Sequence, residues 1–283
     1  MPNKPVKIVT DSVSDIPPDI LKALDISTIP VLVRFGEDVF RDGIDITNEQ
    51  FYKRLEQNKA VPTTAVPSLD LFARTYANLA KKTDDILVVM LSSKLSGLYN
   101  AALQSANLFE SDCHIKVIDS GLAVMAQGFA VIKAAEAAKK GAPIDEVVKV
   151  LQDNFPRAEI RAAFDTLEYL ERGGRIGKAQ AFMGSILKIN PIIMLKDGKV
   201  QPAGRAHSRA KAVDLLYDFA AGYKKIDGLA VEDAACPDDA KELVKRLGKL
   251  YPEEKIIKTH TSPVIGTHTG PGLILVAVLG DRE

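Results

Sequence analysis

Hydroxyl-bearing residues follow an apolar segment at residues 86–91, and this arrangement is the most informative feature of the chain. The apolar run predicts a buried strand, Ser92 and Ser93 end it, and Ser96-Gly97 opens a helical stretch. A helix that begins after a strand presents free backbone N–H groups, which favour an anion. The loop lacks the patterns that bind polyphosphates or dinucleotides, so a small anionic group such as a carboxylate suits it better. The alternative is a capped helix with Ser96 as N-cap.

Three further loops share this polar and weakly charged character, at residues 11–15, 62–68 and 268–272. In a doubly wound parallel sheet, the loops at the carboxyl ends of the strands converge on one crevice. Several hydroxyl-bearing side chains are therefore expected in one site. These residues are Thr63, Thr64, Ser93 and Ser96.

A serine hydrolase is one alternative use of the same crevice. Ser96 lacks the G-x-S-x-G elbow, and His268 with Asp11 or Asp119 would complete a triad only if the fold brought them together. His268 is otherwise expected to pack under the glycines that follow it, or to donate one hydrogen bond into the crevice. Asp11 and Asp15 have the chemistry for a divalent ion, but an aspartate at a strand end more often caps the next helix. We expect no metal site and no cofactor.

The segment Gly173-Gly174-Arg175-Ile176-Gly177 places one charged residue among glycines. Glycine tolerates positive φ, so one interpretation is a tight exposed turn that presents Arg175. The other is a Schellman helix end following Arg172.

Bulk composition excludes several classes of protein. The 283 residues carry 37 Lys and Arg against 37 Asp and Glu, so no global field recruits nucleic acid or an anionic membrane. Cys113 and Cys236 lack the spacing of a zinc site and the density of a disulfide scaffold. The first residues lack the apolar region of a signal peptide, and no apolar run reaches the ~18 residues of a membrane span. We expect a cytoplasmic protein.

The first half of the sequence alternates between strand and helix patterns. This alternation predicts a parallel sheet with helices on both faces. The residues at 122–138 are apolar almost all round, which predicts a buried helix. Expected strands lie at residues 6–9, 27–35, 86–91 and 114–118, and expected helix starts lie at Pro18, the Thr47–Gln50 capping box, Ser68, Ser96 and Pro143.

After Pro156 the pattern changes to α+β with antiparallel pairing. Asp197-Gly198 is a strong hairpin turn pair between residues 191 and 208. We therefore expect an N-terminal α/β domain at residues 1–157 and a C-terminal α+β domain at residues 158–283. Further strands are expected at residues 159–167, 229–231, 256–258 and 272–279, with helices ending near Tyr223 and Leu250.

Five fragments in order resemble the DegV family, the fatty-acid-binding proteins that serve as B subunit of bacterial fatty acid kinase. The resemblance covers essentially the whole chain. Each fragment alone is weak, but five in the same order are specific. The fragments are Asp11–Asp15, Pro62–Ser68, Ser92–Ala101, Leu167–Gly177 and Gly266–Gly272.

The resemblance implies that a long-chain fatty acid lies between the two domains, with its carboxylate bound by Thr64 and Ser96. It implies that the protein is not a catalyst but presents the lipid to a kinase catalytic subunit, which makes the acyl-phosphate with ATP for phospholipid metabolism. Arg175 would dock on the kinase or, transiently, on a membrane. The residues expected to support the head group are Thr63, Ser93, Gly97 and His268.

The chain departs from the family pattern at a few polar positions. Ala65-Val66 replaces a Ser-Gln pair, Leu98 replaces a common Thr, and His207 stands where Arg is usual. Apolar groups beside the carboxylate predict a drier pocket. Burial of each CH₂ contributes about 0.8 kcal/mol, so neutral hydroxyls suffice to orient the head of a long acyl chain. Residues 122–138 and 182–187 are candidate tunnel walls, and a serine hydrolase or small phosphoryl-transfer enzyme remains the rival interpretation.

Overall fold

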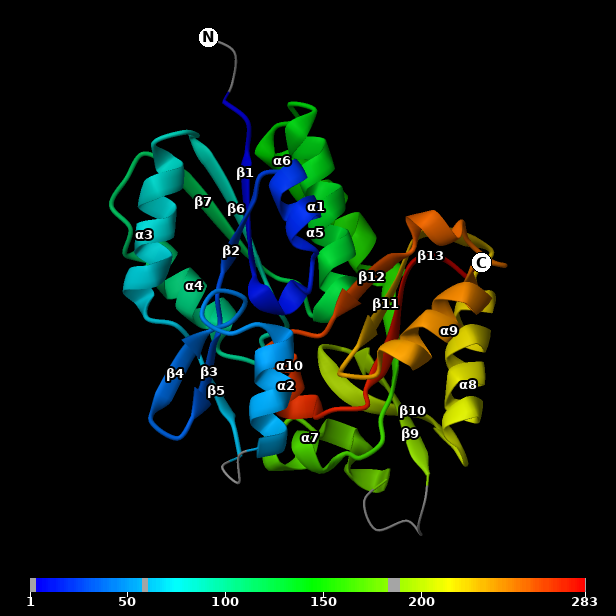
Figure 1. The fold of residues 1–283 in the computed structure, drawn as a ribbon. Coiled ribbons are helices and arrows are strands. Elements are labelled where there is room, and N and C mark those ends of the chain that lie inside the picture. Colours follow the sequence, from blue (N-terminus) through cyan, green and yellow to red (C-terminus); the bar gives the residue numbers. More distant parts are fainter. Residues whose placement is uncertain (1–3, 58–60, 183–188, 283) are drawn as a thin grey trace. The chain divides into compact units, whose positions relative to one another are not determined.

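The computed structural model describes residues 4–57, 61–182 and 189–282 (Figure 1). The chain packs as two compact units. Unit 1 comprises Met1–Leu32 and Ala65–Pro156, and unit 2 comprises Val33–Thr64 and Arg157–Glu283. The chain enters unit 2 for the second time after Pro156. Val33–Thr64, however, packs with unit 2 and not with the rest of the N-terminal half.

Unit 1 is built on a parallel sheet, as the alternation of patterns predicted. Its strand order is β2-β1-β6-β7, and all three pairings are parallel. Strand β6 is buried on both faces, which explains its unbroken apolar sequence. The strands are β1 Lys7–Asp11, β2 Ile26–Ile29, β6 Asp85–Met90 and β7 His114–Asp119.

Helices cover both faces of this sheet, with α3 and α4 on one side and α1, α5 and α6 on the other (Figure 1). Helix α5 packs on β1 and α6 and is buried almost all round, which confirms the prediction for this segment. Gly128 permits this packing, because a Cβ there would lie 2.8 Å from the carbonyl oxygen of Ser14. The helices are α1 Pro18–Ala23, α3 Leu69–Ala80, α4 Leu98–Asn107, α5 Val124–Lys139 and α6 Ile144–Asn154.

The single strand expected at residues 27–35 is wrong. Strand β2 ends at Ile29, and β3 Leu32–Phe35 begins a separate three-stranded sheet of order β4-β3-β5. Pro30 lies between them, and proline supplies no N–H to a strand ladder. The loop expected at residues 62–68 also contains a short strand, β5 Thr63–Ala65, and β4 is Asp38–Arg41.

The predicted capping box at the start of α2 Asn48–Gln57 is confirmed. The Gln50 N–H donates to Thr47 Oγ1 at 3.2 Å, and the Thr47 N–H donates to Gln50 Oε1 at 2.9 Å. Two backbone donors at the helix start are thereby satisfied. The buried face of α2, with Phe51 and Tyr52, packs on α10 Pro263–Thr269.

The large sheet of unit 2 is mixed, with order β10-β9-β8-β13-β11-β12. Only β11 and β12 pair in parallel within it. Asp197 and Gly198 both have positive φ and join β9 to β10, as the turn pair predicted. Strand β8 stops at Ala163, earlier than expected. The strands are β8 Ala158–Ala163, β9 Asn190–Lys196, β10 Lys199–Ala206, β11 Lys225–Asp233, β12 Ile257–His260 and β13 Ile274–Asp281.

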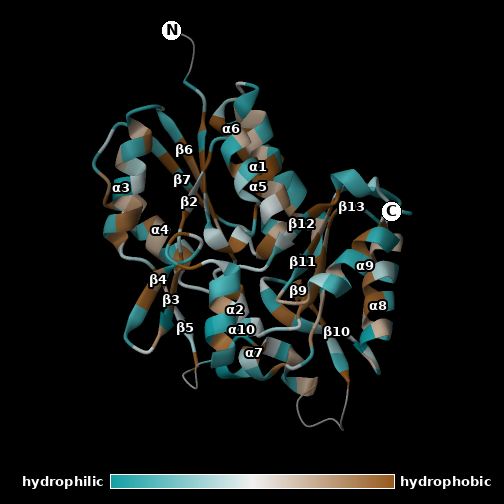
Figure 2. Cartoon of the chain, in the orientation of Figure 1, coloured by the Kyte–Doolittle hydropathy of each residue, from teal (hydrophilic) through white to brown (hydrophobic). Residues whose placement is uncertain are grey.

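Helices α8 Arg209–Ala221 and α9 Pro237–Leu247 cover this sheet with one hydrophobic and one hydrophilic face each (Figure 2). Their apolar residues join those of β11 and β13 in the core of unit 2. Helix α10 was not predicted, so the loop expected at residues 268–272 begins inside a helix.

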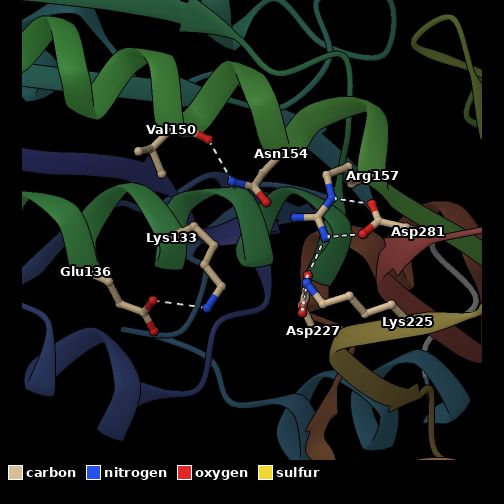
Figure 3. A network of polar contacts seen from close by, with 8 residues as sticks. All are labelled: Lys133, Glu136, Val150, Asn154, Arg157, Lys225, Asp227 and Asp281. Carbon is tan, nitrogen blue, oxygen red and sulfur yellow. Dashed lines mark hydrogen bonds and ion pairs between the residues drawn. The ribbon is translucent and has the colours of Figure 1, made fainter.

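Arg157 is the first residue of the second segment of unit 2, and its side chain links strands of that unit through ion pairs (Figure 3). Its Nε donates to Asp281 Oδ1 at 2.7 Å, and its Nη2 donates to Asp281 Oδ2 at 3.0 Å and to Asp227 Oδ2. The guanidinium holds the pKa of Asp281 below its usual range. The start of β8 is thereby tied to β11 and to the end of β13.

Candidate functional site

A cavity of about 190 Å³ lies within unit 2. It brings together four of the predicted site residues, which come from β5, from the turn after α7 Glu168–Arg172 and from α10. The volume is below the roughly 300–1,000 Å³ of pockets that enclose a whole drug-sized ligand, so it suits a head group. The lining residues are Val61, Pro62, Thr63, Thr64, Tyr169, Arg172, Gly173, Arg175, Thr267 and His268.

Thr64 and His268 form a hydrogen-bonded pair at this cavity. Thr64 Oγ1 lies 2.9 Å from His268 Nε2. Burial of the ring, helped by the positive charge of Arg175, lowers the pKa of His268 from 6.5 to about 4. The imidazole is therefore neutral at pH 7, with one nitrogen protonated and the other an acceptor.

The surroundings of the ring assign its proton to one nitrogen. His268 Nδ1 is buried and has no hydrogen-bond partner among the described residues. A buried N–H without an acceptor is rarer and costlier than an acceptor without a donor, so the proton belongs on Nε2. Nε2–H then donates to Thr64 Oγ1. The hydroxyl proton of Thr64 is left to donate to a ligand, and a carboxylate is a strong acceptor for it.

The turn after α7 is a Schellman motif, so the helix-end interpretation is the right one. The Arg175 N–H donates to the Leu170 carbonyl and the Gly174 N–H to the Glu171 carbonyl, both at 2.9 Å. Gly174 has φ of +69°, the left-handed conformation that this motif needs.

The expectation that Arg175 is exposed is wrong. The side chain is half-buried, it lines the cavity, and its guanidinium donates to the Gly173 carbonyl at 2.6 Å. The Schellman turn directs the chain back toward α10, which brings this side chain beside His268. A docking role for Arg175 stays a prediction, but its position adds positive charge to the cavity.

Two glycines are required here by close packing. A Cβ on Gly173 would lie 2.2 Å from His268 Nδ1, and one on Gly270 would lie 2.3 Å from the Tyr169 ring. Real Cβ atoms do not approach so closely, so helices α7 and α10 meet only because both positions lack a side chain. The glycines of two distant motifs therefore set the place of the His268 ring.

The second group of predicted residues, Ser93, Ser96 and Gly97, belongs to unit 1. Both serines are half-buried in the loop between β6 and α4. Gly97, not Ser96, is the N-cap of α4, and Ser96 Oγ accepts from the Leu98 N–H at 3.3 Å. The Ser96 hydroxyl still has its own proton to donate.

The backbone N–H groups of this loop do not converge on a ligand as predicted. The Ser93 N–H donates to Asp119 Oδ1 at 3.1 Å, and the Lys94 N–H donates to Ser92 Oγ at 3.2 Å. The N–H groups of Leu95 and Ser96 both donate to the Ser92 carbonyl. The expectation is wrong for these four groups, because the loop satisfies three of them itself and Asp119, at the end of β7, satisfies the fourth.

The positions that depart from the family pattern have different surroundings. Leu98 is 1% exposed and belongs to the core, whereas Val66 is 38% exposed and lies beside Gly97. His207 is exposed and lines a separate surface cleft. Met183–Leu187, proposed as part of a tunnel wall, lie outside the described residues, and α5, the other candidate, is used in core packing.

The aspartates that a triad would need are engaged elsewhere. Asp11 accepts from the backbone of Val13 and Leu91, and Asp119 accepts from the backbone of Ser93 and Gly121. Asp11 is the N-cap of a short 3-10 turn, as the capping interpretation predicted. No group of three or more His, Cys, Asp or Glu residues in the described parts of the chain is placed to hold a metal ion.

Sequence reasoning missed Tyr169, Arg172 and Thr267 as cavity residues. Arg172 pairs with Glu168 and lies 6.0 Å from the centre of the Tyr169 ring. The signal was available in part, because all three lie in or beside the glycine motifs already singled out.

Fold and site define a two-unit α/β protein with a cavity whose hydroxyl, guanidinium and imidazole donors suit an anionic head group. The family model described as an uncharacterised protein of the DegV family matches residues 5–281. A DegV domain-containing protein from Streptomyces coelicolor is 36% identical over 280 residues, which cover 96% of this chain and 98% of that protein. The chain therefore belongs to the DegV family.

Two similar solved structures are described as fatty-acid-binding. The DegV family protein from Thermus thermophilus is 32% identical with a TM-score of 0.90, and 98% of this chain and 99% of that one are covered. DegV from Bacillus subtilis is 29% identical with a TM-score of 0.88, and 99% and 100% are covered. In the parts of this chain that are described, no helix is long and apolar enough to cross a membrane.

Proposed function

We propose that this protein binds a long-chain fatty acid and holds its carboxylate through the hydroxyls of Thr64 and Ser96. The observation that carries the proposal is the Thr64–His268 pair, whose Thr64 Oγ1 and His268 Nε2 lie 2.9 Å apart. With the proton of the neutral imidazole assigned to Nε2, the threonine hydroxyl can donate to a ligand. The fatty-acid binding described for the Thermus thermophilus and Bacillus subtilis relatives supports it.

The chemistry of the cavity fits a carboxylate better than a neutral head group. The half-buried Arg175 brings a positive charge, and Thr63 and Thr64 bring hydroxyls. A hydrogen bond to a charged group contributes about 1.5–3 kcal/mol, so a few donors orient the head. Burial of the acyl chain supplies most of the affinity at about 0.8 kcal/mol per CH₂.

The binding experiment titrates delipidated protein with palmitate and with the matching C16 alcohol. Thr64→Val with Ser96→Ala should weaken palmitate binding by about a hundredfold or more, since each of the two lost bonds to the carboxylate is worth about 1.5–3 kcal/mol. Binding of the alcohol should change less. The control pair is Thr75→Val with Ser111→Ala, because the Thr75 hydroxyl bonds to its own helix at Leu71 and Ser111 lies in an exposed turn. Equal palmitate affinity in the site pair and the control pair would place the head group elsewhere.

The role of the bound lipid is presentation to a kinase. This protein does not itself catalyse; a fatty acid kinase catalytic subunit phosphorylates the carboxylate with ATP, in the cytoplasm, with transient contact to a membrane surface. The test is acyl-phosphate formation from palmitate by the kinase subunit with and without this protein. Equal rates with and without it contradict presentation, and acyl-phosphate made by this protein alone contradicts a non-catalytic role.

Arg175 distinguishes head-group binding from docking. Its place in the cavity favours a head-group role, so Arg175→Ala should weaken palmitate binding by about tenfold, the loss of one charge-assisted bond. A variant that keeps full palmitate affinity but loses acyl-phosphate formation assigns Arg175 to docking on the kinase instead. Arg74→Ala is the matched control, because that side chain is exposed, lies outside the cavity and pairs with Asp70.

A further inference from the structure

Asp11, in unit 1, is a buried carboxylate that the proposed function leaves unused. It ends strand β1 and is completely buried. An ionised carboxylate is costly to bury unless hydrogen bonds compensate it. The groups that oppose its burial most strongly are uncharged hydrogen-bond donors. The burial of an ionisable carboxyl group here suggests that its charge has a function that a neutral side chain could not provide.

The carboxylate joins three elements through its two oxygens. Oδ2 accepts from the Leu91 N–H at 2.7 Å and from Gln127 Nε2 at 3.1 Å, while Oδ1 accepts from the Val13 N–H at 3.0 Å. Gln127, on α5, is itself completely buried and also donates to Thr10 Oγ1 at 3.0 Å. All these partners are donors, so both oxygens must act as acceptors.

Leu91 is the residue at which the serine loop begins. The next N–H, of Ser92, donates to the Leu122 carbonyl at 2.8 Å, and that of Ser93 donates to Asp119 at 3.1 Å. Three successive N–H groups are thus fixed by three different parts of unit 1. Because the Ser92 carbonyl then accepts from the Ser96 N–H, the place of Ser96 follows from the place of Leu91 to Ser93.

We infer that Asp11 is a positioning residue for Ser96, and that only its ionised form holds the serine loop in the ligand-binding arrangement. The inference rests on the proposed function. A protonated carboxyl oxygen is a weaker acceptor than a carboxylate oxygen, and the NH₂ of an asparagine does not accept, so either change weakens or breaks a bond from the Leu91 or Val13 N–H. Fatty-acid affinity is therefore coupled to the charge of Asp11.

The charge of Asp11 is lost in mild acid. Burial raises the pKa of this carboxyl from 3.8 to about 6, although the hydrogen bonds oppose the rise. The other carboxylates at this edge of the sheet are Asp15, after the 3-10 turn, and Asp119, at the end of β7. Helix α5 faces Asp11 with the uncharged Gln127, and β6 with backbone. Between pH 7.5 and pH 5 the loop should loosen and the fatty acid should bind less tightly.

The test compares palmitate affinity of the wild-type protein and Asp11→Asn at pH 7.5, 6 and 5. The ionisation of palmitate and of His268 affects both proteins, so the ratio of their affinities isolates Asp11. We expect Asp11→Asn to bind about tenfold more weakly at pH 7.5, the loss of about one hydrogen bond, and the ratio to approach one at pH 5. Asp153→Asn, at an exposed carboxylate paired with Lys149, is the matched control and should keep a ratio of one throughout.

Thermal unfolding of each variant separates loop positioning from a merely structural role. If the ratio of palmitate affinities of the wild type and Asp11→Asn does not change with pH, the inference is overturned, even when the variant is less stable. Should Asp11→Asn not fold, Gln127→Met provides the second variant. This variant lacks one donor to the carboxylate, which raises the pKa of Asp11 further. Palmitate affinity should therefore fall at a higher pH than in the wild type, and a fall at the same pH overturns the inference. Failure of the wild-type protein to bind palmitate at pH 7.5 removes the proposed function as well.

Discussion

Replacing His268 with glutamine removes a ring that the folded chain keeps neutral, and its effect should depend strongly on pH. Glutamine keeps an N–H for Thr64 but does not titrate. In the unfolded chain the imidazole takes up a proton near its ordinary pKa of 6.5, whereas in the fold its pKa is about 4. Acidification between these values therefore protonates the unfolded state first and lowers the free energy of unfolding.

The size of this effect follows from the difference between the two pKa values. A difference of about 2.5 pH units corresponds to about 3 kcal/mol, most of it lost between pH 6.5 and pH 4. The raised pKa of Asp11 acts in the opposite direction over about pH 4 to 6. This contribution is common to both proteins, so it cancels when the variant is compared with the wild type.

The assay is urea unfolding of the delipidated wild type and His268→Gln at pH 7.5 and pH 4.5, because a bound ligand would add its own stabilisation. The wild type should lose about 2.5 kcal/mol more than the variant over this range. NMR titration of the histidine ring protons, with the His268 signal assigned by its absence from the variant, should give a midpoint near 4. A midpoint near 6.5 together with an unchanged stability difference would refute the reasoning.

Three further substitutions test local structure in unit 2. Gly173→Ala should push a Cβ into the His268 ring, which lowers the free energy of unfolding by about 1–3 kcal/mol and shifts the NMR signals of the ring. Gly174→Ala should lower it by about 1–2 kcal/mol through backbone strain alone. Equal shifts of the ring signals in both variants would mean that the contact is not responsible. Thr47→Ala should lower the free energy of unfolding by about 1 kcal/mol, because the capping box of α2 is lost. Palmitate affinity, measured by titration, should not change. A free energy of unfolding within ~0.2 kcal/mol of the wild type would contradict the capping role of Thr47.

Features fixed by neighbours in the sequence could be predicted. The capping box at Thr47 and the turn at Asp197-Gly198 each depend on a few adjacent residues, and both were found as expected. Strand β6 and helix α5 are buried on every side, so nearly all of their residues are apolar. The residue types alone therefore predicted their burial. The break at Pro30 was open to the same reasoning, since proline has no N–H, but the β-branched residues around it favoured one strand.

Features fixed by distant contacts could not be predicted. The burial of Arg175 depends on the left-handed Gly174 and on packing against α10, almost 100 residues later in the chain. Thr64 and His268 were expected to lie in the same site, but their hydrogen bond was not predicted. It forms only because β5 and α10 meet in the fold. Asp11 was recognised as a cap, but its bond to Leu91 depends on the neighbouring strand.

Mass spectrometry of the purified protein tests fatty-acid binding most directly. Under native conditions the mass should exceed that of the 283-residue chain by one long-chain fatty acid, and denaturing extraction should release that acid. A bare chain mass, together with no palmitate binding by the same sample in titration, would contradict the account.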